Sequence, residues 1–268
     1  MSTPKVVVIT GVSSGIGRIA AELFVKRGCK VYGTVRNPAA AKPISAVTLV
    51  EMDVCDDTSV QRGMQNILDQ AGRIDILVNN AGVALMGATE ETSVSEARSL
   101  FETNVYSIMR TSQAVLPSMR SQRSGRIVNV SSVLGMLPAP YMGLYAASKH
   151  AVEGLSSSLD HEVRNFGIRV ALVQPSFTKT SLDSNGAESA TKISAYQEER
   201  RVVTDTVQKA IQNAPEPISA AITIVEAALG PWKLRHTPKG QATLLAFLRR
   251  FMPAGPVDMG LRKTFGLA

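Results

Sequence analysis

The chain has 268 residues, of which 44% are hydrophobic and 19% charged, and it carries a formal net charge of +7. This size and composition suit a single globular domain, residues 1–268, with a sizeable core. No apolar run reaches the ~18 residues of a transmembrane helix, and residues 1–5 leave no room for a signal peptide before the first strand. Cys29 and Cys55 form no CxxC pair and the three histidines have no metal-ligand spacing. We therefore expect reduced thiols, a cytoplasmic protein and no metal.

The positive charge is concentrated at the C-terminal end. Residues 229–268 contain seven lysines and arginines against Asp258 alone, a net charge of +6. No recognised module or interleaved aromatic residues accompany these charges, so we do not expect a nucleic-acid partner. A solvated face on a basic helical tail, residues 241–268, is the simplest interpretation. Its apolar stretch 244–252, with two arginines, could also contact a membrane surface; a subunit interface or core packing is the favoured alternative.

Short apolar runs rich in β-branched residues alternate with helical periodicity along the chain. Strands are predicted at residues 5–10, 30–35, 48–53, 74–79, 126–130 and 169–174. Helices are predicted at 15–27, 58–70, 94–119 and 145–165. Such alternation predicts an α/β fold with one doubly wound parallel sheet, the Rossmann architecture, and helices on both faces.

A glycine-rich turn joins the first strand to the first helix. It begins at Gly11, continues through Ser13, Ser14, Gly15 and Ile16, and ends at Gly17. Glycines permit a tight turn and let backbone N–H groups approach a pyrophosphate, and the helix N-terminus adds a favourable dipole. In this strand–turn–helix context the turn predicts dinucleotide binding, with an ordinary βα loop as the alternative.

The turn after the second strand indicates which dinucleotide binds. An acid at this position binds the ribose 2′-OH of NAD, whereas an arginine accommodates the 2′-phosphate of NADP. Here Val35 is followed directly by Arg36, and a guanidinium fits a phosphate well. The sequence therefore predicts NADP(H), with Ser13 and Ser14 as further hydroxyl donors; the alternative is that Arg36 is an ordinary surface residue.

Tyr145 and Lys149 are four residues apart in a predicted helix and so share one face. A nearby ammonium favours the phenolate and lowers the phenol pKa, which makes tyrosine a usable general acid/base. Ser132, thirteen residues upstream, could donate a hydrogen bond where negative charge develops on a carbonyl. Each residue alone has a structural explanation, as a half-buried core tyrosine or a turn serine.

Together these motifs resemble the short-chain dehydrogenase/reductase family. The resemblance is to NADP-type members, and it is nearest to the hydroxysteroid- and retinol-type dehydrogenases. The matches span residues 5 to about 180 and include Thr10-Gly11-(x)3-Gly15-Ile16-Gly17, Asp53-Val54, Asn79-Asn80-Ala81-Gly82, Asn104, Ser132, Tyr145-(x)3-Lys149 and Pro175-(x)4-Thr180. The resemblance implies a seventh strand near 234–237, helices at 241–252 and 256–265, a substrate-loop region at 176–230 and a homodimer or homotetramer. Within that region, residues 182–194 are expected to form a mobile loop that closes over the substrate.

The resemblance also implies a role for each remaining site residue. Asp53 and Val54 would contact the adenine, and Asn80, Ala81 and Gly82 would lie beside the cofactor. Pro175 and Thr180 would flank the nicotinamide, with Thr178 near its carboxamide. Lys149 would also bind the nicotinamide ribose, and Asn104 would hold a helix kink and a water that feeds protons to Lys149.

The segment between Ser132 and Tyr145 carries no charge, which favours an apolar substrate over an acidic one; a loop packed on the core is the alternative. We therefore expect NADPH-dependent hydride transfer between the nicotinamide and a hydrophobic carbonyl or secondary alcohol, with Tyr145 as general acid/base. The alternative function is a catalytically silent, NADP(H)-responsive binding or regulatory protein on the same fold. Such proteins typically lack the tyrosine or the lysine, and this chain has both.

Overall fold

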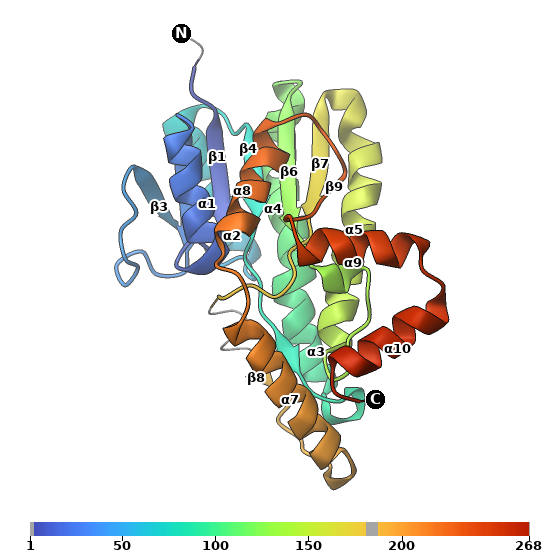
Figure 1. Ribbon diagram of the computed structural model, residues 1–268. Coiled ribbons are helices and arrows are strands. Elements are labelled where there is room, and N and C mark those ends of the chain that lie inside the picture. The colour runs from blue at the N-terminus through green and yellow to red at the C-terminus, as the bar shows by residue number, and fades with distance from the viewer. Residues whose placement is uncertain (1–2, 181–186, 268) are drawn as a thin grey trace.

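The structure is a computed structural model that describes residues 3–180 and 187–267. Seven parallel strands form its main sheet, in the spatial order β3-β2-β1-β4-β6-β7-β9 (Figure 1). In chain order they are β1 (Val6–Thr10), β2 (Lys30–Val35), β3 (Val47–Glu51), β4 (Ile76–Asn79), β6 (Gly125–Val130), β7 (Ile168–Val173) and β9 (Arg235–His236). The predicted doubly wound parallel sheet is confirmed, including the short seventh strand.

Helices cover both faces of this sheet (Figure 1). They are α1 (Gly15–Lys26), α2 (Asp57–Ala71), α3 (Val94–Phe101), α4 (Ser107–Ser121), α5 (Gly143–Val163), α7 (Gln197–Gln212), α8 (Ile218–Leu229), α9 (Gln241–Phe251) and α10 (Ala254–Thr264). One core lies between the sheet and α1 with α8, where Phe24 and Ile224 are fully buried. A second core lies on the opposite face under α2 and α4, around Met64 and Met119.

The central strands are apolar up to their last residues, Thr10 and Asn79, because both of their faces are covered. All five residues of β1 and all four of β4 are buried. From β1 the chain builds outward through β2 and β3, then returns to the other side of β1 and adds β4, β6, β7 and β9. The order therefore reverses between β1 and β4, and ligands of open α/β sheets bind beyond the carboxyl ends of the strands at such a point.

The predicted helix over residues 94–119 is interrupted. A π-helical segment, Glu102–Tyr106, separates α3 from α4 and contains Asn104. Single π-helical turns inside α-helices frequently occur at functional sites. The kink expected at Asn104 thus corresponds to a local change in helix type.

The region 176–230 contains more structure than the substrate loop that the sequence predicts. The helices α7 and α8 occupy most of it, and β8 (Ala187–Glu188) pairs in parallel with β5 (Leu85–Met86) in a second, two-stranded sheet. Residues 182–186 of the expected mobile loop lie outside the described residues. Of those that follow, Ala187–Glu188 form β8, residues 189–193 have no regular secondary structure, and a short 3-10 turn, Ser194–Tyr196, begins at the last of them.

The helices α9 and α10 end the chain and project beside α5 (Figure 1). They correspond to the two helices expected after the seventh strand. Across the described ranges, none of the helices is both long enough and apolar enough to cross a membrane.

Candidate active site

A cleft of about 780 Å³ lies at the carboxyl ends of the central strands and brings most of the predicted site residues together. The predicted residues that line it are Gly11, Ser13, Ser14, Gly15, Ile16, Arg36, Asp53, Val54, Asn80, Ala81, Gly82, Ser132, Tyr145, Lys149, Pro175, Thr178 and Thr180. All predicted site residues lie in the described part of the chain, and only Gly17 and Asn104 are outside the lining. Sequence positions more than 160 residues apart therefore meet in one site.

The glycine-rich turn follows β1 and lies between the cleft-lining loops after β2 and β3 and those after β4 and β6. Gly11 and Gly15 have φ values of +71° and +59°, in the left-handed region that glycine adopts without strain. α1 begins at Gly15, so its N-terminal turn and positive dipole end lie at the cleft. These features match the requirements for binding a pyrophosphate.

The turn is fixed to the end of β4 by a set of short hydrogen bonds. Asn80 Nδ2 donates to the carbonyl oxygens of Thr10 and Gly11, both at 3.0 Å. In return, Thr10 Oγ1 accepts from the backbone N–H groups of Asn80 and Ala81, also at 3.0 Å. Thr10 is thus a positioning residue that the sequence prediction did not include among the site residues, although it precedes the glycine motif directly.

Gly17 contributes through close packing and not through contact with the cleft. A Cβ atom at this position would lie 2.4 Å from Asn80 Nδ2 and 2.5 Å from the Gly11 carbonyl oxygen. Real Cβ atoms do not approach other atoms so closely. A side chain at residue 17 would therefore push against the hydrogen bonds that fix the turn.

The part of the cleft on the β2 and β3 side is polar. Arg36 is exposed directly after β2 and lines the cleft. Asp53 Oδ1 accepts a hydrogen bond from the Cys55 N–H at 2.9 Å, which orders the loop after β3. Glu51, which lies opposite Val35 in the β2–β3 register, does not line the cleft. The turn after β2 therefore presents the cationic Arg36 and lacks the acid that binds the ribose 2′-OH of NAD.

Ser132, Tyr145 and Lys149 meet on the β6 side of the cleft. α5 carries Tyr145 and Lys149 one turn apart, and both residues are buried. Lys149 Nζ donates to the Val130 carbonyl oxygen at 3.0 Å, at the end of β6, and lies 5.7 Å from the centroid of the Tyr145 ring. The ammonium is thus held beside the aromatic ring by the sheet.

Ser132 lies in the turn after β6, where its Oγ accepts from the Leu134 N–H at 3.1 Å. Its hydroxyl also donates to the Pro175 carbonyl oxygen at 3.5 Å. The contact in which the hydroxyl donates, to Pro175, is long, and the serine lies on the wall of the open cleft. The hydroxyl proton can therefore be redirected to a ligand oxygen without breaking a strong bond.

Asn104 lies behind this wall and is fully buried. Its Nδ2 donates to Ser148 Oγ at 3.1 Å and to the Val83 carbonyl oxygen at 3.0 Å, and its Oδ1 accepts from the Val83 N–H at 2.9 Å. Ser148 precedes Lys149 in α5. Asn104 therefore joins α5 to the loop after β4, which is a positioning role.

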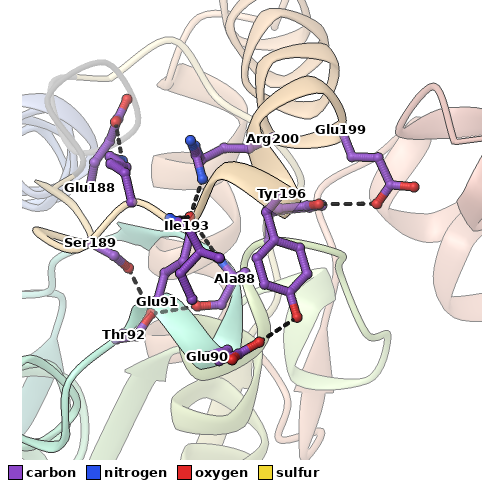
Figure 2. Close-up of polar contacts among 12 residues, drawn as sticks. Ala88, Glu90, Glu91, Thr92, Glu188, Ser189, Ile193, Tyr196, Glu199 and Arg200 are labelled. Carbon is purple, nitrogen blue, oxygen red and sulfur yellow. Dashed lines mark hydrogen bonds and ion pairs between the residues drawn. The ribbon is translucent and has the colours of Figure 1, made fainter.

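A polar network that the sequence analysis did not predict holds one side of the cleft (Figure 2). We call residues 187–200 the substrate arm. Glu91, fully buried, pairs with Arg200 and accepts from the Ile193 N–H at 2.8 Å. Glu90 accepts from the Tyr196 hydroxyl at 2.7 Å.

The arm also joins the cleft wall through its backbone. β8 pairs with β5, and Leu85, Ala187 and Glu188 line the cleft. Nothing local in the sequence marks Glu91 as a buried residue, because its arm partners Ile193 and Arg200 lie about 100 positions later.

The surroundings of Glu91 decide its charge. Burial alone would raise the pKa of its carboxyl group, but the N–H groups of Ile193 and Ala88 and the Arg200 guanidinium outweigh that effect and hold the pKa below its usual value. Nearby, burial and a hydrogen bond to Glu199 raise the pKa of Tyr141 to about 12. At neutral pH the arm is therefore attached by a charged carboxylate, and the Tyr141 hydroxyl keeps its proton.

Comparison with known proteins connects this geometry to a family. The family model described as short chain dehydrogenase matches residues 5–191. A 3-ketodihydrosphingosine reductase from Bacteroides thetaiotaomicron is 35% identical and covers 98% of this chain and 99% of its own.

Two solved structures extend the match to the whole fold. A short-chain dehydrogenase from Streptomyces avermitilis is 34% identical, with a TM-score of 0.81 and coverage of 97% of this chain and 99% of its own. A short-chain dehydrogenase/reductase from Burkholderia phymatum, solved in complex with NAD, is 27% identical, with a TM-score of 0.78 and coverage of 96% and 95%. The chain therefore belongs to the short-chain dehydrogenase/reductase family of oxidoreductases.

Proposed function

We propose that this protein transfers hydride between NADP(H) and a hydrophobic carbonyl compound or secondary alcohol. The observation that carries the proposal is the meeting of Ser132, Tyr145 and Lys149 with the glycine-rich turn in one cleft. The Burkholderia phymatum relative with bound NAD supports a nicotinamide cofactor for this chain as well.

The residues present fit such a cofactor. The left-handed Gly11 and Gly15 and the start of α1 would hold the pyrophosphate. Asp53 and Val54 would hold the adenine. The exposed Arg36 would bind the 2′-phosphate of NADP, since a guanidinium pairs with phosphate through two hydrogen bonds. Pro175, Thr178 and Thr180 line the cleft, with Pro175 in contact with Ser132, and would hold the nicotinamide.

The bound nicotinamide supplies or accepts the hydride, and the protein manages the proton. In the reductive direction Tyr145 donates its phenolic proton to the carbonyl oxygen, where negative charge develops. Ser132 donates a hydrogen bond to the same oxygen and fixes its position. Lys149, held by the Val130 carbonyl oxygen, places a positive charge beside the tyrosine and stabilises the phenolate that remains.

The substrate class follows from the rest of the wall. The apolar residues Leu85, Leu100, Val133, Leu134, Met142 and Phe177 line the cleft. Apolar walls with a few convergent polar groups are typical of sites for hydrophobic ligands. The Bacteroides relative is named as a reductase of a ketone. We therefore propose an apolar ketone as the substrate in the reductive direction.

Tyr145→Phe tests this proposal by removing only the phenolic hydroxyl. We expect kcat for NADPH oxidation with apolar ketones to fall about 10²–10⁴-fold, the usual contribution of a general acid, while NADPH binding is retained. Absorbance at 340 nm measures turnover and fluorescence titration measures binding.

Tyr106→Phe is the matched control, since Tyr106 is exposed and lies outside the cleft lining. Full turnover in the Tyr145 variant would contradict the proposal. Tight NADPH binding by the unaltered protein without turnover of any ketone or alcohol would favour the regulatory alternative.

A further inference from the structure

The C-terminal hairpin, which we define as α9 and α10, exposes an apolar face that the proposed reaction does not use. Leu244, Phe247 and Phe251 lie at positions i, i+3 and i+7 of α9 and therefore share one side of the helix. Their exposed fractions are 56%, 60% and 65%. The two phenylalanine rings contact each other, with centroids 4.9 Å apart. Large side chains of this kind, gathered on one exposed face, mark an interaction surface.

The hairpin that carries this face is basic. The basic residues of the C-terminal hairpin are Arg249, Arg250, Arg262 and Lys263, against Asp258 alone. Within the described residues, none of these four cations forms an ion pair with a carboxylate. The Arg250 guanidinium lies 5.5 Å from the Phe251 ring centroid, so charge and apolar surface are directly adjacent.

The inner side of the hairpin fixes it to the body of the protein. Leu245, Val257 and Leu261 pack in the same apolar cluster as Leu134, which lines the cleft. Arg249 Nε donates to the Met136 carbonyl oxygen at 3.1 Å. The exposed face therefore belongs to a firmly packed element beside the cleft wall.

We propose that the outer face of the C-terminal hairpin binds an anionic lipid surface. A helix with phenylalanine and leucine on one side and arginine beside them lies in the interface of a bilayer, where apolar burial and attraction to anionic headgroups act together. A second copy of this chain fits the face less well. An isologous contact would bring the same arginines of two protomers against one another. The proposal goes beyond the proposed function and does not depend on it.

Vesicle sedimentation of the full-length protein tests the proposal. With vesicles of equal parts phosphatidylcholine and phosphatidylglycerol we expect binding that weakens in 1 M salt, and with phosphatidylcholine alone at least tenfold weaker binding. The double substitution Phe247→Ser and Phe251→Ser is expected to weaken binding to the anionic vesicles at least tenfold. Arg250→Gln is expected to weaken it about fivefold, since one cation near the surface contributes about 1 kcal/mol.

Ile222→Ser is the matched control, because Ile222 is an exposed apolar residue of α8, outside the C-terminal hairpin. It should leave vesicle binding unchanged, and all variants should keep the helical circular dichroism of the parent and its turnover of a soluble ketone. Equal binding to both vesicle types would overturn the proposal. So would an absence of vesicle binding, or a double variant whose only change is a smaller oligomer in light scattering, which would identify the face as a subunit interface.

Discussion

Gly17 shows how a residue can serve a binding site that it does not touch. Its missing Cβ leaves room for Asn80 Nδ2 and for the Gly11 carbonyl oxygen, which share a hydrogen bond. In Gly17→Ala the new methyl group must displace one of them. We expect the free energy of unfolding to fall by about 1–3 kcal/mol, as for other overpacked sites. NADPH binding should weaken at the same time, because the turn itself shifts. Urea denaturation and fluorescence titration measure the two effects.

Gly154→Ala is the matched control for this prediction. Gly154 lies inside α5, and a Cβ there would meet nothing within 4 Å. Alanine is favoured over glycine in a helix interior by about 1 kcal/mol, so this variant should be more stable and should bind NADPH normally. Equal unfolding midpoints for the two variants would show that close packing at Gly17 does not matter.

The glycine motif in the sequence predicts the turn but does not distinguish the roles of its glycines. Gly11 and Gly15 face the cleft, whereas Gly17 faces the end of β4. That difference depends on Asn80, which is 63 positions away and whose side chain points back to the turn. Asn104 is a similar case. The resemblance implied a kink, but the hydrogen bonds to Val83 and Ser148 are tertiary contacts without a local signal.

At the scale of elements, the substrate arm depends on one buried carboxylate. Glu91 accepts from the Ile193 N–H and pairs with Arg200, so its charge holds both ends of the segment that follows β8. Glu91→Gln keeps the shape and removes the charge. Hydrogen bonds to charged groups contribute about 1.5–3 kcal/mol. We expect KM for the ketone to rise about tenfold, with kcat and the NADPH dissociation constant within about twofold of the parent.

Glu90→Gln is the control, since the adjacent Glu90 is exposed and contacts only the Tyr196 hydroxyl among the described arm residues. It should change KM less than twofold. Equal KM values for the two variants would contradict a positioning role for Glu91.

The pH of the assay matters for this comparison. Because the pKa of Glu91 is lowered in the folded protein, the contribution of its charge to stability is fully present above the ordinary carboxyl pKa and is lost as the pH falls through the pKa of the folded state. Assays near pH 7 therefore measure the charged state.

The elements that the sequence predicts well are those with a strong local pattern. Buried parallel strands are continuous apolar runs, so β1, β2, β3, β4, β6 and β7 are predicted to within about two residues, whereas β9 (Arg235–His236) was expected only from the family resemblance. β5 and β8 have two residues each and show no periodicity. α8 is apolar and combines four alanines with three isoleucines, a valine and a threonine, a composition that does not separate helix from strand. α7 did carry a signal that the analysis missed, because Val203, Val207 and Ile211 recur every four residues and are all buried.

At the scale of the whole molecule, the strand order explains why distant motifs form one site. The turn after β1, the loops after β2 and β3 and the segments after β4, β6 and β7 all start at the same edge of the sheet. A cofactor bound along this edge contacts both halves of the fold. Its binding free energy therefore stabilises the folded chain as a whole, because the unfolded chain has no such edge.

The choice of cofactor can accordingly be measured on the intact protein without knowledge of the substrate. At a concentration 100 times its dissociation constant, a ligand adds about 2.7 kcal/mol to the stability. For a chain of this size that raises Tm by about 5–10 °C. Because Arg36 lines the cleft and no acid follows β2, we expect a larger increase in Tm with NADPH than with NADH at equal concentration, measured by differential scanning fluorimetry.

Arg36→Asp should reverse this preference, so that NADH raises Tm more than NADPH, since a carboxylate repels the 2′-phosphate and binds the ribose hydroxyl. Arg62→Asp, an exposed change on α2 outside the cleft lining, should leave the preference unchanged. If NADH stabilises the parent as strongly as NADPH does, Arg36 does not select the cofactor.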